Sequence, residues 1–375
     1  MKPLAPEGTV ALTLNGSPIL GNNAITDSTT NEKVFSLTRF TEYKLNKDET
    51  AYIAHHRKRV NLSDGFLLPA SIHRYNTAWD ATRDHLIDSR QHGLSNKCED
   101  AACNPCEPCS SKGKTGRRNA WVNYVGRNNS YRSSYSNNEI ENGDWEIATN
   151  GIQVGLDLYK KTNTQFGLLF GYEDSKATLY FDRLEANDVY FGGYIAYVFR
   201  NNVDFRAVYN YGSQDYKLNR FDPGLGFGWN SHNSDFDGNT HELNLEFGKR
   251  FFVNRRWSYR PVIGFDLFVN NWNATLENGN PSTAIAYGNT DYTQAFLRIG
   301  SDLKFVKNRF VFNSGLYYSY DVNDNDLKTK VFARNDSELG YDKAINSTLY
   351  GSRLGRSVLT FNLGGSIALN KKCSV

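Results

Sequence analysis

Long runs of alternating apolar and polar residues fill the second two thirds of the chain. In one of them, Ile152, Val154 and Leu156 alternate with a glutamine, a glycine and an aspartate. Neighbouring side chains of a β-strand point to opposite faces, so each run predicts a strand with one apolar face and one polar or small-residue face. Ten runs have this pattern: residues 121–127, 152–159, 165–172, 189–199, 203–211, 242–247, 259–269, 297–305, 310–320 and 359–369.

The length of these runs and the connections between them favour a membrane barrel over a soluble β-sandwich, which also alternates. Most runs reach about ten residues, the length of a tilted membrane strand and about twice that of a soluble strand. Short connections are predicted at residues 160–163, 200–202, 253–256 and 307–309, and long ones at 128–148, 173–187, 212–240, 270–292 and before the last run. Short turns on one rim and long loops on the other are typical of outer-membrane barrels, with the short side periplasmic.

Composition agrees with this interpretation and excludes other classes. Aromatic residues make up 14% of the 375 residues, and the mean hydropathy is -0.59. Barrels have low average hydropathy and gather aromatic residues at the membrane interfaces. The sequence has no apolar stretch of about 18 residues, so it predicts no transmembrane helix. The net charge of only +3 gives no case for a nucleic-acid partner.

The polar face of the runs contains charges that would be very costly in lipid. We therefore expect them to line a wet lumen, where opposite charges pair: Asp157, Asp204, Arg206, Glu242, Glu246, Arg260, Asp266, Arg298, Asp302 and Lys304. Glycines share this face and either leave room for an occupant such as a helix or relieve strand curvature. They are Gly155, Gly167, Gly171, Gly264, Gly300, Gly315 and Gly364.

A helix is expected in residues 70–96, before the strand region. Apolar residues fall near one stripe at helical spacing, and a glycine at position 93 provides a stop. The charged remainder of this helix either faces solvent or lies in a polar barrel lumen. Residues 1–69 are polar and mixed, and we interpret them as a passenger remnant or a spacer.

Residues 97–118 predict a Cys-rich linker that should not fold alone. Cys98, Cys103, Cys106 and Cys109 are dense enough for a zinc or iron–sulfur site. Disulfides are the favoured fate in an envelope protein, and their connectivity cannot be deduced from spacing. We therefore expect disulfides among these four cysteines, with a metal site and no fixed role as the alternatives.

Several segments of the strand region resemble the autotransporter β-domain, and the resemblance covers roughly residues 119–370. They are NAWVNYVGR at 119–127, NGIQVGLDLYKKTNTQFGLLFGYEDS at 150–175, YFGGYIAYVF at 190–199, FRAVYNYGSQDY at 205–216, FLRIGSDLKF at 296–305 and GRSVLTFNLGGSIAL at 355–369. The resemblance implies a twelve-stranded barrel whose pore holds the helical linker to an exported passenger. The Cys-rich lead-in and GRRNAWVNYVGR are similar to a planctomycete-like branch.

Both ends of the chain depart from the family pattern. The first residues lack the basic stretch and apolar core of a signal peptide, so we expect a start upstream. The chain ends in NKKCSV and not in the aromatic residue that the barrel assembly machinery reads in this family. We therefore expect a C-terminally truncated chain. A ten-stranded variant closed by residues 327–333, or completion by another chain, is the alternative.

No motif for catalysis or cofactor binding accompanies these features. The histidines show no HExxH spacing, no serine lies in a GxSxG context, and the glycine pairs lie inside predicted strands. We interpret the lumen carboxylates as members of a charge network and not as acid–base catalysts. The sequence predicts neither an enzyme nor a cofactor.

We therefore expect an all-β fold, a transmembrane antiparallel β-barrel with about ten of twelve strands present in residues 119–375. It is preceded by an α-helix and an irregular N-terminal segment. The expected function is that of a translocator in type V secretion, exporting or anchoring an N-terminal passenger in cis. Its expected partners are outer-membrane lipid and the barrel assembly machinery. The alternative is a stand-alone outer-membrane barrel acting as a channel or surface-binding protein through its long loops.

Overall fold

The structure is a computed structural model, and it describes most of the strand region together with short earlier segments. The described residues are 8–10, 13–14, 17–18, 34–38, 41–45, 52–56, 79, 82–83, 85–86, 120–131, 145–161, 163–179, 182–199, 201–223, 229–254, 256–279, 284–307, 310–323, 327–335, 340–350, 357–370 and 373–374. The Cys-rich linker at 97–118, with its four cysteines, lies outside them.

Ten long strands form the body of the molecule, and each contains one of the ten predicted runs. They are β7 (Ala120–Tyr131), β8 (Trp145–Lys160), β9 (Thr164–Leu179), β10 (Asp182–Val198), β11 (Val203–Pro223), β12 (Trp229–Lys249), β14 (Trp257–Trp272), β17 (Thr290–Lys307), β18 (Phe310–Asp321) and β21 (Ser357–Asn370). Two short strands, β13 (Phe251–Phe252) and β22 (Cys373–Ser374), pair with β14 and β21.

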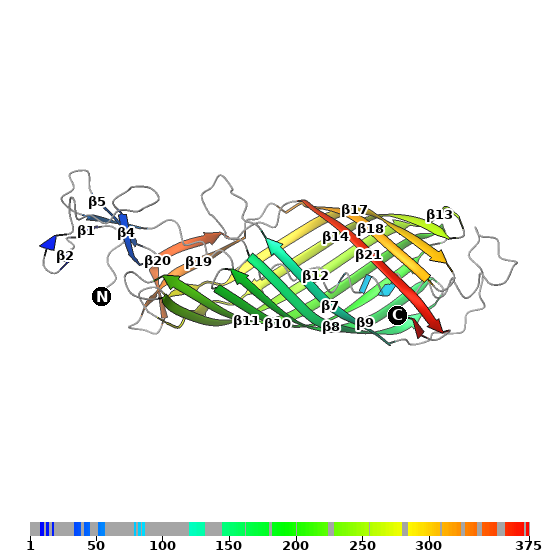
Figure 1. The fold of residues 1–375 in the computed structure, drawn as a ribbon, viewed down its shortest axis with the longest axis horizontal. Helices are drawn as coiled ribbons and strands as arrows, with labels where there is room; N and C mark the ends of the chain where they lie inside the picture. Colours follow the sequence, from blue (N-terminus) through cyan, green and yellow to red (C-terminus); the bar gives the residue numbers. More distant parts are fainter. Residues whose placement is uncertain are drawn as a thin grey trace.

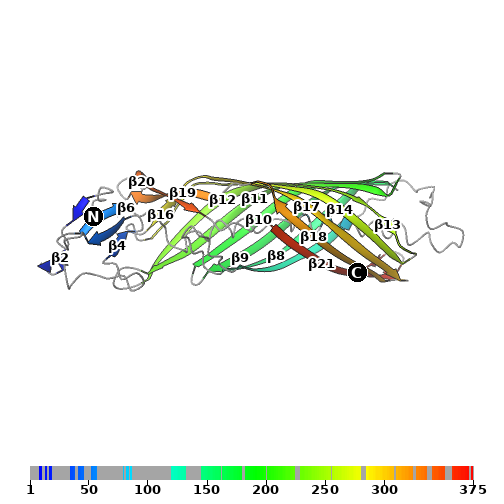
Figure 2. The ribbon, with the colours of Figure 1, turned by 90° about the horizontal axis from the view of Figure 1, so that it is seen from above.

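The long strands pair antiparallel with their neighbours in one curled sheet. The order runs from β22 through β21, β18, β17, β14, β12, β11, β10, β9 and β8 to β7. Each strand crosses the long axis of the molecule obliquely, and the sheet curls around an interior (Figure 1, Figure 2). The short connections and the C-terminus lie at one end of this curl, and β19, β20 and the N-terminal strands lie at the other (Figure 1).

Two of the predicted long loops are wrong, because the strands continue through them. Residues 173–187 belong almost entirely to β9 and β10, which are paired from Asp182 and Leu179 onward. Residues 212–240 belong to β11 and β12, which stay in register from Val203 to Pro223. These hairpins project beyond the rest of the sheet, so the predicted long side is built of extended strands as well as loops.

The connections after β14 and after β18 form a second sheet beside the mouth of the curl. Its order is β15 (Thr275–Leu276), β16 (Ile285–Tyr287), β19 (Lys328–Asn335) and β20 (Gly340–Tyr350). The alternative that residues 327–333 close the barrel wall is wrong, because β19 pairs with β16 and β20 in this separate sheet. We call these four strands the mouth sheet.

The N-terminal region, which the sequence predicts to be irregular, contains short strands. One sheet has the order β1 (Gly8–Val10), β6 (Tyr52–His56), β5 (Thr41–Leu45) and β4 (Val34–Thr38), and β2 (Thr13–Leu14) pairs with β3 (Ser17–Pro18). Their places beyond the mouth sheet are visible in Figure 1.

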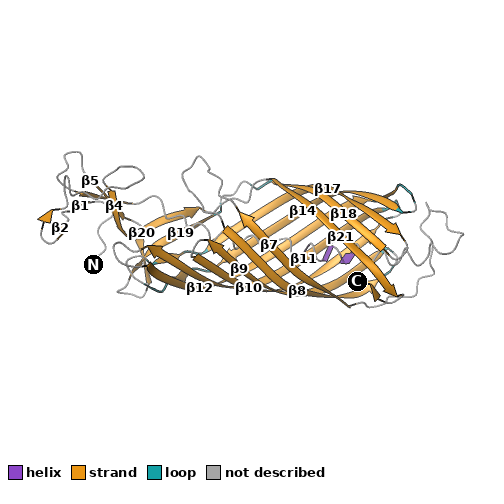
Figure 3. Cartoon of the chain, viewed as in Figure 1, coloured by secondary structure: helices purple, strands orange, loops and turns teal. Residues whose placement is uncertain are grey.

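Five residues within the predicted helix are described, and all five are helical: Trp79, Thr82, Arg83, His85 and Leu86. They lie inside the curl of the large sheet (Figure 3). No described helix is long and apolar enough to cross a membrane. The rest of the predicted helix lies outside the described residues.

Candidate functional site

The outer face of the large sheet is a belt of exposed apolar side chains. On β10 the outward apolar positions run from Val189, which is 44% exposed, to Phe199, which is 46% exposed. Ten residues of strand span about 33 Å, and a tilt of about 40° reduces this to about 25 Å, the height of a lipid-facing band. Beyond the belt the outward residues become polar, as at Asp174 after Tyr172 and Asn187 before Val189. The belt therefore has the dimensions of a membrane-spanning wall.

The inner face of the same strands is charged. Nine of the ten polar residues singled out from the sequence are buried there: Asp157, Asp204, Arg206, Glu242, Glu246, Arg260, Asp266, Arg298 and Lys304. The tenth, Asp302, has a side chain that is 15% exposed. Alternation brings these residues to one face, and the curl of the sheet then brings strands β11, β12, β14 and β17 close enough for their charges to meet.

Seven of these residues form one connected set of ion pairs, the inner charge cluster: Asp204, Arg206, Glu246, Arg260, Asp266, Arg298 and Asp302. At its centre, Arg260 Nη1 lies 2.8 Å from Glu246 Oε1 and 2.8 Å from Asp302 Oδ2, and Arg260 also pairs with Asp204. Glu246 is fully buried and faces guanidinium groups from three strands. The cluster contains four carboxylates and three guanidiniums, and Arg250 beside it also interacts electrostatically with Asp204 and Asp302.

Arg83 of the helical segment adds a guanidinium to the inner charge cluster. Its Nε lies 3.2 Å from Glu246 Oε2, and its Nη2 lies 2.8 Å from Asp302 Oδ1. Arg83 also donates to the hydroxyl of Tyr317, over whose ring its Cζ lies at 4.3 Å. A buried charge is tolerated only when it is paired and hydrogen-bonded. Arg83 of the segment and the two carboxylates of the wall therefore stabilise each other in the interior.

A second group of polar contacts holds the segment at the β7–β9 side of the wall. His85 Nε2 lies 3.1 Å from Asp157 Oδ1, and the imidazole stacks on Trp121 with 4.6 Å between ring centroids. Tyr194 donates to the same Asp157 oxygen over 2.6 Å. Gln153 on β8 donates to the Thr82 hydroxyl over 3.3 Å. The segment thus contacts both halves of the curl.

Apolar contacts accompany these polar ones. Trp79 and Leu86 are 1% and 0% exposed, and they pack in a buried cluster with inner-face side chains of β9, β10 and β11. The cluster also contains Leu169, Tyr190, Tyr194, Ala196 and Val208. Burying a tryptophan and a leucine contributes roughly 2–3 kcal/mol each relative to exposure, so this packing adds to the charge pairing.

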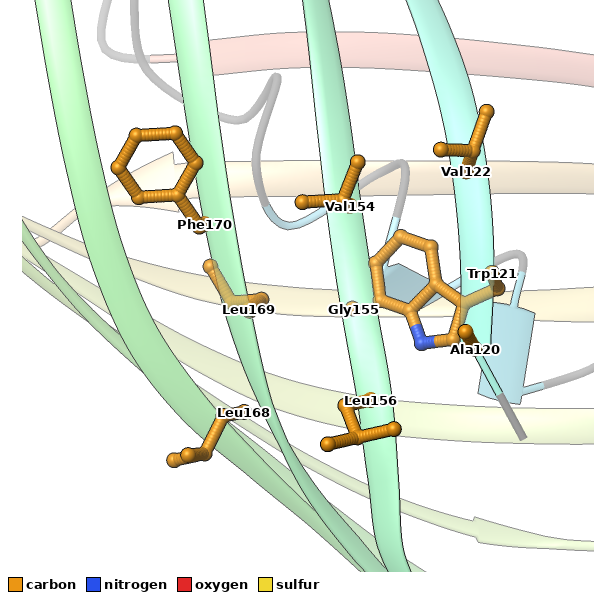
Figure 4. A pocket seen from close by; sticks show the side chains of 9 residues that line it. All are labelled: Ala120, Trp121, Val122, Val154, Gly155, Leu156, Leu168, Leu169 and Phe170. Atoms are coloured by element: carbon orange, nitrogen blue, oxygen red, sulfur yellow. The ribbon is translucent and has the colours of Figure 1, made fainter. Parts of the chain in front are cut away.

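The inner-face glycines accommodate aromatic rings of the wall itself. A Cβ at Gly155 would lie 2.2 Å from the Trp121 ring, and Figure 4 shows that ring beside Gly155 between β7 and β8. Tyr194 and Tyr190 lie in the same way over Gly167 and Gly171, and Tyr317 over Gly300 and Gly315. A Cβ at Gly364 would meet nothing within 4 Å. The room that these glycines leave is therefore filled first by neighbouring rings, and the helical segment packs against those rings.

The pattern of the wall inverts beyond the lipid-facing belt. In the projecting hairpins the outward positions are mostly polar, and several inward positions are apolar. Ten inward side chains of the large sheet, including Leu184, Tyr216, Leu218 and Phe268, form a buried cluster with residues of the mouth. The mouth contributes Ile285, Tyr287, Leu327 and Val331 to that cluster. The mouth sheet is thus fixed to the end of the curl by a hydrophobic core of its own.

A buried ion pair within this region was missed by the sequence analysis. Arg220 on β11 donates to both carboxylate oxygens of Glu277, with Nε–Oε1 at 2.6 Å. The Ile285 amide and the Tyr287 hydroxyl donate to Glu277 over 2.9 and 3.0 Å. The sequence pattern predicts a loop at residues 212–240. Arg220 stands at an even-numbered position of β11, as Asp204 and Arg206 do, and so faces inward, but the predicted loop hides this alternation.

No group of three or more histidine, cysteine or acidic residues within the described part of the chain could hold a metal ion. The cysteine quartet lies outside that part, so its predicted disulfides stay a prediction.

The comparison with protein families identifies one family, and the structural comparison finds other outer-membrane barrels. The protein-family model described as "Autotransporter beta-domain" matches residues 120–375. The translocator domain of the autotransporter NalP from Neisseria meningitidis is similar in structure, with a TM-score of 0.52 and 12% identity over 78% of this chain and 87% of that chain. The β-domain of the Bordetella autotransporter BrkA matches 68% of this chain and 100% of its own length, with 15% identity and a TM-score of 0.35. A comparison with curated proteins found no significant match.

Proposed function

The chain belongs to the autotransporter β-domain family of type V secretion, and on this premise we propose that it anchors its own N-terminal segment through a lumen filled by the helical segment. Membership assigns it to the outer membrane of Gram-negative bacteria, to a non-enzymatic family and to the handling of a passenger. The proposal concerns how the passenger is anchored. Residues 70–96 would be the linker that stays in the lumen, and residues 1–69 would be the end of the passenger.

The contact of Arg83 with the inner charge cluster carries this proposal. Arg83 reaches Glu246 on β12 and both Asp302 and Tyr317 on the neighbouring pair β17 and β18. Glu246 is fully buried, and removing Arg83 would take the closer of two guanidiniums away from its Oε2 atom, which weakens a buried ion pair at a large cost. The fit of one side chain to this charge supports a segment retained in place and not one that passes through only once.

The test compares three forms of the full chain in planar lipid bilayers. We expect deletion of residues 70–96 to raise the single-channel conductance, because the lumen loses its occupant. Arg83→Glu should raise it as well, since a second carboxylate beside Glu246 and Asp302 repels the segment. Arg83→Lys, which keeps a positive charge beside Glu246 and Asp302, should keep the conductance low. Unchanged conductance on deletion would contradict the proposal.

A matched control uses Arg183→Glu, the same charge reversal at an exposed position of β10. It should leave conductance unchanged, because Arg183 lies outside the inner charge cluster. Folding of every variant is checked first by heat-modifiable mobility on gels.

The alternative of an open channel fits these contacts less well. The buried cluster at the mouth and the helical segment both occupy the path that ions would take. Surface binding by the projecting hairpins is compatible with anchoring and is not a rival to it.

Finer expectations stay proposals alongside this one. We expect assembly by the barrel assembly machinery, disulfides among the cysteines of residues 97–118, and membership of the planctomycete-like branch.

A further inference from the structure

The rim at the short connections is strongly basic. The short connections and the residues beside them, 160–163, 200–202, 249–256 and 307–309, together contain nine Lys and Arg and no Asp or Glu in the sequence. The segments of the opposite end at 173–188, 212–240 and 270–296 contain eleven Asp and Glu against four Lys and Arg. The wall is therefore charged oppositely at its two ends, and the positive end is the one with short connections.

Four cations of this rim are described and exposed, Lys161, Lys249, Arg256 and Lys307. We call them the rim cations. The carboxylates close to these cations along the chain or across a strand pair are Asp157, Asp204, Glu246 and Asp302. All four lie on the inner face, where His85, Arg260 and Arg83 engage them. No described outward-facing carboxylate on this rim balances the four positive charges.

Exposed aromatic rings lie directly beside the rim cations. Lys161 Nζ lies 5.1 Å from the ring centroid of Tyr159, and Lys249 Nζ lies 5.2 Å from that of Phe251. Phe251 and Phe252 are 46% and 49% exposed. Long basic side chains lay their aliphatic stems along apolar surface and hold the charge at the polar boundary. Aromatic rings toward the belt and cations toward the short connections therefore mark the level of the lipid headgroups on this side.

We propose that the rim cations bind the phosphate headgroups of anionic phospholipids in the leaflet that the short connections face. Charge complementarity identifies the ligand, because basic side chains at headgroup level attract anionic lipid. This attraction decays within about one Debye length of the surface. The apolar belt just beside the cations is the place for the acyl chains of the same lipids. A soluble acidic protein would contact the cations alone and gain nothing from the exposed rings.

The test measures lipid retained by the purified full chain, in detergent, by native mass spectrometry after addition of phosphatidylglycerol or phosphatidylcholine. We expect phosphatidylglycerol to be retained at least fivefold more than phosphatidylcholine, with the excess falling as salt rises. A variant with Lys161→Gln, Lys249→Gln, Arg256→Gln and Lys307→Gln should lose most of this excess.

A matched control removes four exposed positive charges at the opposite end through Arg183→Gln, Lys217→Gln, Lys328→Gln and Lys330→Gln. It should keep the excess, because the net charge of the chain falls equally but the rim stays basic. If the rim variant does not fold, the pair Lys161→Gln and Lys307→Gln takes its place with a smaller expected loss. Equal retention of both lipids, or equal loss in rim and control variants, would overturn the proposal. So would binding of polyglutamate in preference to phosphatidylglycerol.

Discussion

Arg260 and Glu246 lie on paired strands, yet they are not cross-strand partners. The ladder between β12 and β14 pairs Glu246 with Gly264, four positions beyond Arg260. The guanidinium spans this offset, and Arg260 Nη1 lies 2.8 Å from Glu246 Oε1. Gly264 has no side chain to block that reach. The oblique contact is possible because the strands are tilted and sheared in a curled wall.

Glu246→Gln should therefore destabilise the protein strongly. Neutralising Glu246 leaves the guanidiniums of Arg83, Arg206, Arg260 and Arg298 facing one another with fewer carboxylates. Breaking a buried pair in this way costs about 3–5 kcal/mol. The measurement is the urea midpoint in detergent micelles, followed by heat-modifiable gel mobility. Glu185→Gln, at a half-exposed side chain on β10, should shift stability by less than about 0.5 kcal/mol.

Gly300→Ala should impair folding, whereas Gly364→Ala should not. A Cβ at Gly300 would lie 2.4 Å from the Tyr317 ring and 2.5 Å from a backbone oxygen, so strand or ring must move. Such overpacking costs about 1–3 kcal/mol. A Cβ at Gly364 would meet nothing within 4 Å. Thermal unfolding of the two variants separates a packing role of these glycines from one in strand curvature, for which both substitutions would cost the same.

Ala207→Arg and Ser213→Arg test where the lipid-facing belt ends. Both are small outward-facing residues of β11, and Ala207 pairs with Ile195 inside the belt while Ser213 pairs with Val189 at its edge. An arginine costs about 2–4 kcal/mol at the bilayer midplane and about 0–1 kcal/mol near the interface. The refolding free energy in phospholipid vesicles should therefore fall clearly for Ala207→Arg only. Equal losses would place the belt elsewhere on the strand.

Glu277→Ala should release the mouth sheet while the large sheet stays folded. Arg220, the Ile285 amide and the Tyr287 hydroxyl would all lose their shared acceptor. We expect hydrogen exchange at residues 284–287 to accelerate at least tenfold, because each buried donor left unpaired costs about 1–3 kcal/mol. Asp215→Ala, at an exposed carboxylate of β11, serves as the control. Unchanged exchange in the Glu277 variant would mean that the hydrophobic cluster alone holds the mouth sheet.

The sequence by itself determined the ten strands, their antiparallel order and the side of the wall that each side chain faces. These follow from a period of two and from the alternation of connection lengths, which are local properties of the chain. The predicted strand begins too late on β10 and ends too early on β11. On β10 the apolar positions change phase between Val189 and Ala186, because the outer surface passes from lipid to water and the inner surface becomes a core. A search for one constant apolar face takes that change of phase for a loop.

Only the tertiary structure decided which charges meet. Arg83 and Glu246 are 163 residues apart, and Arg220 and Glu277 are 57 apart, so no spacing along the chain relates them. Their contacts depend on strand tilt, on the curl that closes the inner face and on the segment that lies within it. Alternation predicts the face on which a charge lies. The partner of that charge depends on how the strands and the helical segment are arranged in space, which the pattern along the chain does not specify.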